Sequence, residues 1–153
     1  MGKYRKILIA IDGSESSRNA LLQAFRLAVE EKCWITVASV VPPVTGDLDL
    51  TGVDDVRASL AKPCEEALRE AQRLAEQERI LIKTVCEEGE TYERIVDVAE
   101  EQNADIIVMG RRGLRRMARA LVGSVTARVI GHTQRDVLVV PSHAALGWKK
   151  IVT

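Results

Sequence analysis

The chain has 153 residues, of which 46% are hydrophobic and 29% are charged, a mixture typical of one ordinary globular domain. Its 22 basic and 22 acidic residues balance, which argues against a protein that coats nucleic acid or an anionic membrane. Aromatic residues make up only 3%, so the core must be built from aliphatic side chains. We therefore expect one aliphatic-cored domain that has neither nucleic acid nor a membrane as its partner.

The three cysteines, Cys33, Cys64 and Cys86, are widely spaced and include no Cys-x-x-Cys pair. This pattern argues against a disulfide framework or a zinc site and favours a reducing compartment. The amino terminus leads into an apolar run that is too short for a signal sequence or a membrane span. We expect a cytoplasmic protein, with Cys33 and Cys86 as inert thiols in or beside strands.

Strand-like and helix-like segments alternate along the chain. Unbroken β-branched runs mark strands buried on both faces of a parallel sheet, and apolar residues at helical spacing mark the helices between them. The predicted strands cover 6–12, 34–41, 80–85, 105–109 and 137–140. The predicted helices begin at 13–17, run over 54–77 and 90–101, and begin again at Gly123 and Ser124. Residues 42–53 are expected to form a loop, and Pro63 to delay or kink the second helix.

This alternation predicts an α/β fold whose parallel sheet is covered on both faces. Ligands of such folds bind beyond the carboxyl ends of the strands, where the winding direction reverses. With strand order 3-2-1-4-5, Asp12 and Gly110 lie side by side at the ends of the first and fourth strands. The predicted domain covers residues 1–143.

Residues 144–153 are assigned to a tail. Within it, residues 148–153 repeat the character of residues 4–9, an aromatic residue, two basic residues and then apolar strand formers. Six residues make a weak repeat signal. Two interpretations stay open: an ordinary tail or edge strand, and the start of a second tandem copy of the domain.

Residues 110–125 carry the strongest functional signal. Two residues separate Gly110 from Gly113, and Gly123 and Ser124 follow after nine more. Glycines let backbone N–H groups approach a ligand, and a helix start adds unpaired donors and the positive end of the helix dipole. Six arginines in or near this segment favour an anion: Arg111, Arg112, Arg115, Arg116, Arg119 and Arg128. The alternative is a structural turn followed by a glycine at a helix start.

Two further residues point into the same crevice. Asp12 fits a turn before Gly13, a hydrogen bond to a ribose hydroxyl, or support for a metal ion, and these roles are compatible. Val40, at the end of the second strand, would present its backbone N–H and C=O to an adenine edge. A P-loop and a Gly-x-Gly-x-x-Gly fingerprint are both absent from the sequence.

Catalytic signatures are weak in this chain. His132 and His143 are expected outside the crevice, and the sequence after Gly13 lacks the Gly-x-Ser-x-Gly pattern of a nucleophile elbow. No carboxylate pair or cluster of metal ligands stands out. We predict no catalytic residue and no metal held by the protein's own side chains.

The chain resembles the universal stress protein family from end to end. The resemblance rests on Lys-Ile-Leu-Ile-Ala-Ile-Asp-Gly-Ser at 6–14, Ala-Asp-Ile-Ile-Val-Met-Gly at 104–110 and Val-Leu-Val-Val-Pro at 137–141. The glycine segment matches the family's ATP-binding pattern, Gly-x2-Gly-x9-Gly-Ser/Thr, at every fixed position. Arg111 and Arg112 depart from the family's frequent Ser-His, which leaves the contacts of those two side chains open.

The resemblance implies a five-stranded, Rossmann-like domain of the adenine nucleotide α-hydrolase type that binds ATP and dimerises through its last strand, here 137–140. Mg²⁺ or Mn²⁺ would be held through the phosphates. The implied nucleotide-binding residues are Ala10, Ile11, Asp12, Val40, Met109, Gly110, Arg112, Gly113, Gly123, Ser124 and Val125.

Three hypotheses about function follow. The first is a regulatory or stress-response protein that acts on an unknown protein partner, with ATP as a switch or structural ligand. The second is an enzyme of the adenine nucleotide α-hydrolase group, such as a slow ATP hydrolase. The third is a nucleotide-free homodimer that works through protein interaction alone.

Overall fold

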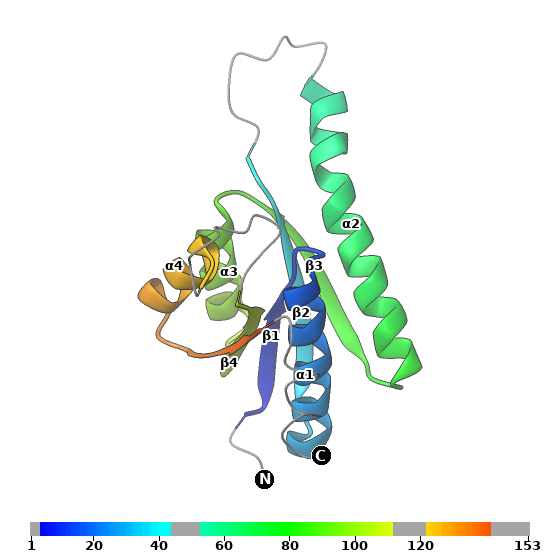
Figure 1. Cartoon of the computed structure of the whole chain (residues 1–153), viewed down its shortest axis with the longest axis vertical. Coiled ribbons are helices and arrows are strands. Elements are labelled where there is room, and N and C mark those ends of the chain that lie inside the picture. The colour runs from blue at the N-terminus through cyan, green and yellow to red at the C-terminus, as the bar shows by residue number, and fades with distance from the viewer. Residues whose placement is uncertain (1–3, 44–52, 112–121, 142–153) are drawn as a thin grey trace.

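The computed structural model describes residues 4–43, 53–111 and 122–141, and gives only the backbone for 53–57. Strands and helices alternate in these ranges (Figure 1). The strands are β1 (Lys6–Ala10), β2 (Trp34–Val41), β3 (Ile82–Glu88), β4 (Ile106–Gly110) and β5 (Asp136–Val140). The helices are α1 (Glu15–Glu31), α2 (Val53–Gln77), α3 (Thr91–Glu101) and α4 (Ser124–His132).

The strands form one parallel sheet in the order β3-β2-β1-β4-β5, which confirms the predicted fold class and strand order. The central strands are the unbroken apolar runs of the sequence. Leu8, Val37 and Ile107 are fully buried, because helices cover both faces of the sheet. The edge strands β3 and β5 alternate between exposed and half-buried residues along most of their length.

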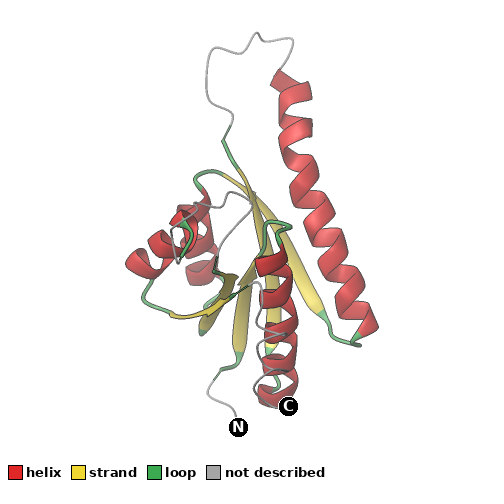
Figure 2. Cartoon of the chain, viewed as in Figure 1, coloured by secondary structure: helices red, strands yellow, loops and turns green. Residues whose placement is uncertain are grey.

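Helices α1 and α2 pack on one face of the sheet, and α3 and α4 pack on the other (Figure 2). The first face buries Ile7, Ile9 and Val37 against α1 and α2. The second buries Leu8 and Ile107 against α3 and α4. The buried side chains are aliphatic as predicted, and Phe25 is the one buried aromatic residue within the described ranges.

Helix α2 is long, and its buried side chains are small, with the half-buried Leu68 and Leu74 packed beside them. It begins at Val53 and continues through Pro63, so the proline does not delay its start. Among its described side chains the first buried one is Cys64, followed by Ala67, Ala71 and Ala75. The part of α2 that precedes these residues extends past the end of the sheet (Figure 1). The sheet therefore holds the helix through its second half.

Strand β3 lies later in the chain than predicted, at 82–88 instead of 80–85. Ile80 belongs to the turn that ends α2, since its N–H donates to the Ala75 carbonyl (2.8 Å) after Arg79 adopts a left-handed conformation (φ 57°). At its other end β3 continues through Glu87, which pairs with Val40. An edge strand tolerates charged side chains, so an apolar run does not mark its boundaries.

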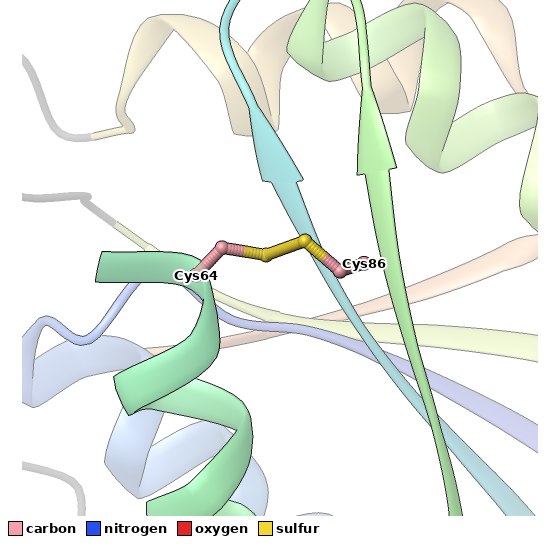
Figure 3. Close-up of a disulfide and its surroundings, with 2 residues drawn as sticks. All are labelled: Cys64 and Cys86. Carbon is pink, nitrogen blue, oxygen red and sulfur yellow. A yellow bond between two sulfur atoms is a disulfide. The ribbon is translucent and has the colours of Figure 1, made fainter. Parts of the chain in front are cut away.

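A disulfide joins Cys64 of α2 to Cys86 of β3 (Figure 3). The prediction that Cys86 is an inert thiol is therefore wrong, and the cysteine spacing that argued against disulfide bonding did not exclude this bond. The two cysteines are 22 residues apart, and their Cα atoms approach to 6.5 Å because α2 crosses over the edge of the sheet at this point. Cys33 is a free thiol, as predicted.

Candidate functional site

A pocket of about 450 Å³ lies at the carboxyl edge of the sheet, where β1 and β4 end side by side. At this point the chain winds away from β1 to one side and from β4 to the other, and open α/β sheets bind ligands in such crevices. The pocket is lined by strand ends, by the turn after β1, and by the first turns of α3 and α4.

Nine of the predicted site residues line this one pocket: Ala10, Ile11, Asp12, Val40, Met109, Gly110, Gly123, Ser124 and Val125. They come from three strands and one helix, and the parallel sheet brings them together because its strands end at one edge. The other two, Arg112 and Gly113, lie outside the described residues. The contact of all eleven with a nucleotide stays a prediction.

The turn from β1 into α1 satisfies its own polar groups. The Asp12 carboxylate accepts from the Ser14 N–H (2.9 Å), and the Ser14 hydroxyl caps the helix by accepting from the Ser17 N–H (3.2 Å). The Ser17 hydroxyl in turn donates to the Ser14 carbonyl (3.0 Å). Gly13 has φ +87°, a left-handed conformation that suits glycine. The turn-forming role considered for Asp12 is thus present, and the residue also lines the pocket.

Gly110 ends β4 under the first turn of α1. A Cβ added there would lie 2.6 Å from the Ser16 Cβ and 2.7 Å from the Ser16 carbonyl carbon. Real Cβ atoms essentially never approach other atoms this closely. Gly110 is therefore required by helix packing, a role separate from the phosphate contact that the motif predicts.

The start of α4 is built differently from the start of α1. Its N-cap is Gly123, whose backbone is extended (φ −64°, ψ 158°) and which has no side chain to cap the helix. The Gly123 N–H donates to the Arg111 carbonyl (2.7 Å), and the buried Thr126 hydroxyl donates to the Gly110 carbonyl (2.9 Å). These two bonds fix α4 against the end of β4. The amide groups of its first turn have no side-chain cap, and this turn faces the pocket.

The other end of the pocket is largely apolar and includes an open strand edge. The ladder between β1 and β2 ends at Ala38, whose carbonyl accepts from the Ile11 N–H (2.9 Å). Since backbone groups alternate sides along a strand, the Val40 N–H and C=O point past the end of β1 toward the pocket. Pro42 and Ile95 line this end as well. A flat, apolar ring with a polar edge would fit here.

Sequence reasoning missed several residues that line the pocket. They are Ser17, Ala38, Pro42, Thr91, Ile95 and Thr126. Thr91 and Ile95 lie on the first turns of α3, and the sequence does not tell where that helix crosses the sheet. Helix starts and strand ends share one edge in this fold, so the start of the predicted helix 90–101 was the available signal for Thr91.

The described residues test the expected cluster of arginines only in part. Asp12 is the one charged side chain among the described lining residues. Arg128, counted among the arginines near the glycine segment, lies instead over the Tyr92 ring (5.3 Å) and pairs with Glu90 (3.7 Å). The remaining arginines of the segment, apart from Arg111, lie outside the described residues.

Among the side chains that the structure describes, metal ligands and histidines do not gather at the pocket. Within residues 4–43, 53–111 and 122–141, no three His, Cys, Asp or Glu side chains group to hold a metal ion. His132 lies at the end of α4 against Tyr92, with ring centroids 4.9 Å apart, and does not line the pocket. His143 is outside the described residues.

The opposite edge of the sheet has a different character. A hollow of about 360 Å³ there contains the exposed Trp34 and Leu81 together with Lys6 and Lys83. Beside it, Asp105 accepts backbone N–H groups from Arg5 (2.8 Å) and Lys6 (2.9 Å), and these bonds hold the pKa of Asp105 below its usual value. This edge has no helix start that faces the hollow, so we place the candidate site at the carboxyl edge.

None of the described helices is both long enough and apolar enough to span a bilayer.

Comparison with known proteins adds to this geometry. The profile of the Universal stress protein family matches residues 3–141. Universal stress protein MJ0531 of Methanocaldococcus jannaschii is 37% identical over 144 residues, which cover 90% of this chain and 82% of that protein. Universal stress protein UspA from Lactobacillus plantarum superposes with a TM-score of 0.79 at 25% identity, over 92% of this chain and 99% of that one.

The similar structures include complexes with nucleotides. One of them is a universal stress protein in complex with cAMP, with a TM-score of 0.71 and 29% identity over 91% of this chain and 98% of that one. The fold, the family profile and the relatives agree. The chain belongs to the universal stress protein family.

Proposed function

We propose that this protein binds ATP in the pocket at the carboxyl edge of its sheet and uses the nucleotide as a regulatory switch or structural ligand in a stress response. The observation that carries the proposal is the start of α4, where an N-cap without a side chain leaves amide donors facing the pocket. Helix starts of this kind bind phosphate through N–H groups and the helix dipole. The cAMP complex of a related structure supports an adenine nucleotide as the ligand class.

The described residues fit such a ligand from end to end. The first turn of α4 would hold the phosphates, Asp12 the ribose hydroxyls, and the Val40 backbone the adenine edge, with Ile95 against the ring. A bound Mg²⁺ or Mn²⁺ would be held through the phosphates, which supply the oxygen ligands that these ions prefer. Among the described lining residues Asp12 is the one carboxylate, so its side chain is the best suited to add an oxygen ligand to such an ion.

The identity and occupancy of the ligand are tested together by mass spectrometry of small molecules released from the purified protein. We expect ATP or a related adenine nucleotide at close to one per chain. Protein purified without a bound nucleotide should bind added ATP saturably, at close to one per chain, in calorimetry. Release of an unrelated compound, with no ATP binding to the emptied protein, would contradict the proposal.

We propose binding without rapid turnover, which the described lining residues support. The described ones include no histidine, lysine or arginine, so no general base beyond Asp12 and no cationic clamp is in evidence there. We expect ATP hydrolysis far below the ordinary enzyme range of roughly 1–1000 per second. Turnover within that range would favour the alternative, an ATP hydrolase of the adenine nucleotide α-hydrolase type.

We further propose that two copies pair through β5, with residues 137–140 at the interface. This strand is an edge of the sheet, and Leu138 is 38% exposed on it. No described strand pairs with the outer side of β5, and an apolar edge of this kind is a template for a second strand. We expect the native protein to be a dimer in light scattering and Leu138→Lys to be a monomer. A monomeric native protein would contradict this pairing, and with it the hypothesis of a nucleotide-free interaction dimer.

The remaining parts of the proposal concern context. We propose a cytoplasmic protein with one domain over residues 1–143 and a protein partner of unknown identity. The tail 144–153, expected to be either an ordinary tail or the start of a second copy, lies outside the described residues.

A further inference from the structure

The disulfide joins two residues of very different exposure (Figure 3). Cys64 is 4% exposed, whereas Cys86 is an exposed residue of the edge strand β3. A thiolate opens a disulfide by attacking one sulfur and displacing the other, so access decides which sulfur is attacked. Cys86 is therefore the half that a thiol from solution can reach, and Cys64 is the leaving half.

The bond anchors α2 at the first point where it meets the sheet. The described residues that precede it in the helix, 58–63, are all exposed or half-buried. After Cys64 the buried contacts come from Ala67, Ala71 and Ala75. Alanine side chains bury little apolar area, Leu68 and Leu74 pack beside them half-buried, and the Arg18–Glu70 ion pair (2.6 Å) is largely exposed. All of these contacts of α2 lie after Cys64. Without the disulfide, the helix would lose the contact that holds its amino-terminal half.

The third cysteine provides an internal contrast. Cys33 is half-buried, and its thiol donates to the Tyr4 carbonyl (2.9 Å). Burial, followed by the negative charges of Glu31 and Asp105, raises the pKa of the Cys33 thiol, which disfavours the reactive thiolate. Thiol chemistry is thus directed to the Cys64–Cys86 pair.

We propose that the Cys64–Cys86 pair is a thiol–disulfide exchange site, opened at Cys86 by small-molecule thiols, whose state controls the order of the amino-terminal half of α2. A thiolate attacks the Cys86 sulfur, the S–S bond breaks, and Cys64 leaves as a thiolate that takes a proton from solvent. A second thiolate attacks the small-molecule sulfur of the mixed disulfide, which releases a small-molecule disulfide and the Cys86 thiolate. Two thiols are oxidised as the protein disulfide is reduced, and the reverse sequence closes the bond.

The exchange site lies one strand away from the candidate pocket. Cys86 pairs with Ser39, which stands between the pocket-lining residues Ala38 and Val40. The Gly89 N–H donates to the Val41 carbonyl (3.0 Å). The pairing of β2 with β3 therefore extends to the residue before Pro42, which lines the pocket. Release of α2 would loosen this end of β2, so we expect reduction to weaken nucleotide binding. This last step rests on the proposed function.

The exchange itself is tested by mass spectrometry of the full chain in buffers of graded glutathione to glutathione disulfide ratio, with quenching by N-ethylmaleimide in denaturant so that buried free thiols are labelled too. The chain has three cysteines. We expect one labelled cysteine, Cys33, in oxidising buffers, three in reducing buffers, and a glutathione adduct on Cys86 at intermediate ratios. Three labels at every ratio, or adducts on Cys64 as often as on Cys86, would overturn the proposal.

The structural consequence is tested by hydrogen exchange and thermal unfolding of the oxidised and reduced chains. Reduction should speed amide exchange in residues 58–66 of α2 and lower the melting temperature by roughly 10 °C. Cys86→Ser, at an exposed position, should reproduce the reduced state under oxidising conditions, and Cys33→Ser should behave as the native protein. Equal exchange rates in both states would contradict the anchoring role.

The coupling to the pocket is tested by ATP titration of the same two states. We expect binding to the reduced chain and to Cys86→Ser to be about fivefold weaker than to the oxidised chain. Equal affinities would overturn the coupling while leaving the proposed function intact. An absence of ATP binding in both states would overturn the proposed function and the coupling with it, and the labelling pattern would still decide the exchange reaction.

Discussion

Three helices begin at the candidate pocket, and the first turns of two of them, α1 and α4, are built in opposite ways. At α1 the chain supplies its own acceptors, since Ser14 caps the helix and Asp12 accepts from the Ser14 N–H. At α4 the N-cap is Gly123, and no side chain among the described residues caps the first amide groups. The first arrangement satisfies the backbone from within the fold. The second leaves donors for a ligand, so we assign structure to the start of α1 and anion binding to the start of α4.

The largest expected effect comes from Gly110, where the two helix starts share a strand end. Gly110→Ala places a Cβ within 2.7 Å of Ser16 atoms, including its backbone carbonyl carbon, so α1 must move. We expect a loss of about 3 kcal/mol of unfolding free energy in urea denaturation. Gly131→Ala is the matched control, because an added Cβ there meets no atom within 4 Å. Equal stabilities of the two variants would show that α1 does not need the glycine.

The next effect separates binding from folding. Gly123→Val keeps a backbone conformation that valine accepts, and its side chain covers the donors at the start of α4. We expect ATP affinity in calorimetry to fall by about 2 kcal/mol, roughly 30-fold, with at most about 1 kcal/mol lost from stability. Unchanged affinity in a folded variant would remove α4 from the site.

The cap of α1 should show the converse behaviour. Ser14→Ala removes the acceptor for the Ser17 N–H and should cost about 1 kcal/mol of unfolding free energy. Because Ser14 does not line the pocket, ATP affinity should change little. A large loss of affinity without a loss of stability would reverse the roles assigned to the two helix starts.

The smallest effect lies at the far edge of the sheet. Backbone hydrogen bonds from Arg5 and Lys6 lower the pKa of Asp105 in the folded state. Its stabilising contribution is therefore present above the unfolded pKa of about 3.9 and is lost as the pH falls through the lower folded value. Asp105→Asn should flatten the acid limb of stability against pH and leave ATP affinity unchanged. An identical acid limb in the variant would contradict the role of these two bonds.

The sequence predicted the parts of the fold that depend on continuous apolar runs. Strands β1, β2 and β4 follow from such runs, because burial on both faces leaves no place for polar residues. The start of β3 differs because the apolar Ile80 belongs to the turn that ends α2, and its end differs because an edge strand carries charges such as Glu87. The Cys64–Cys86 bond was missed because it depends on the rotation of α2 and on where that helix crosses the sheet, and local sequence sets neither.

The site divides in the same way. The motif placed Gly110, Gly123 and Ser124 at the pocket, because glycine spacing and a helix start are local signals. The sequence did not predict that Thr91 and Ile95 line the pocket, because the packing of α3 on β2 brings them there. The motif predicts only a phosphate contact for Gly110, whereas its close approach to Ser16 shows that the packing of α1 also requires a glycine there.

The most direct test of the account is an ATP titration of the ¹⁵N-labelled chain followed by amide NMR. We predict that the largest shifts fall on the amides of Ser124 and Val125 at the start of α4, with smaller shifts at Glu15 and Ser16 in the first turn of α1. Saturation without movement of the α4 amides, or shifts centred on the Trp34 edge of the sheet, would contradict the assignment of the pocket.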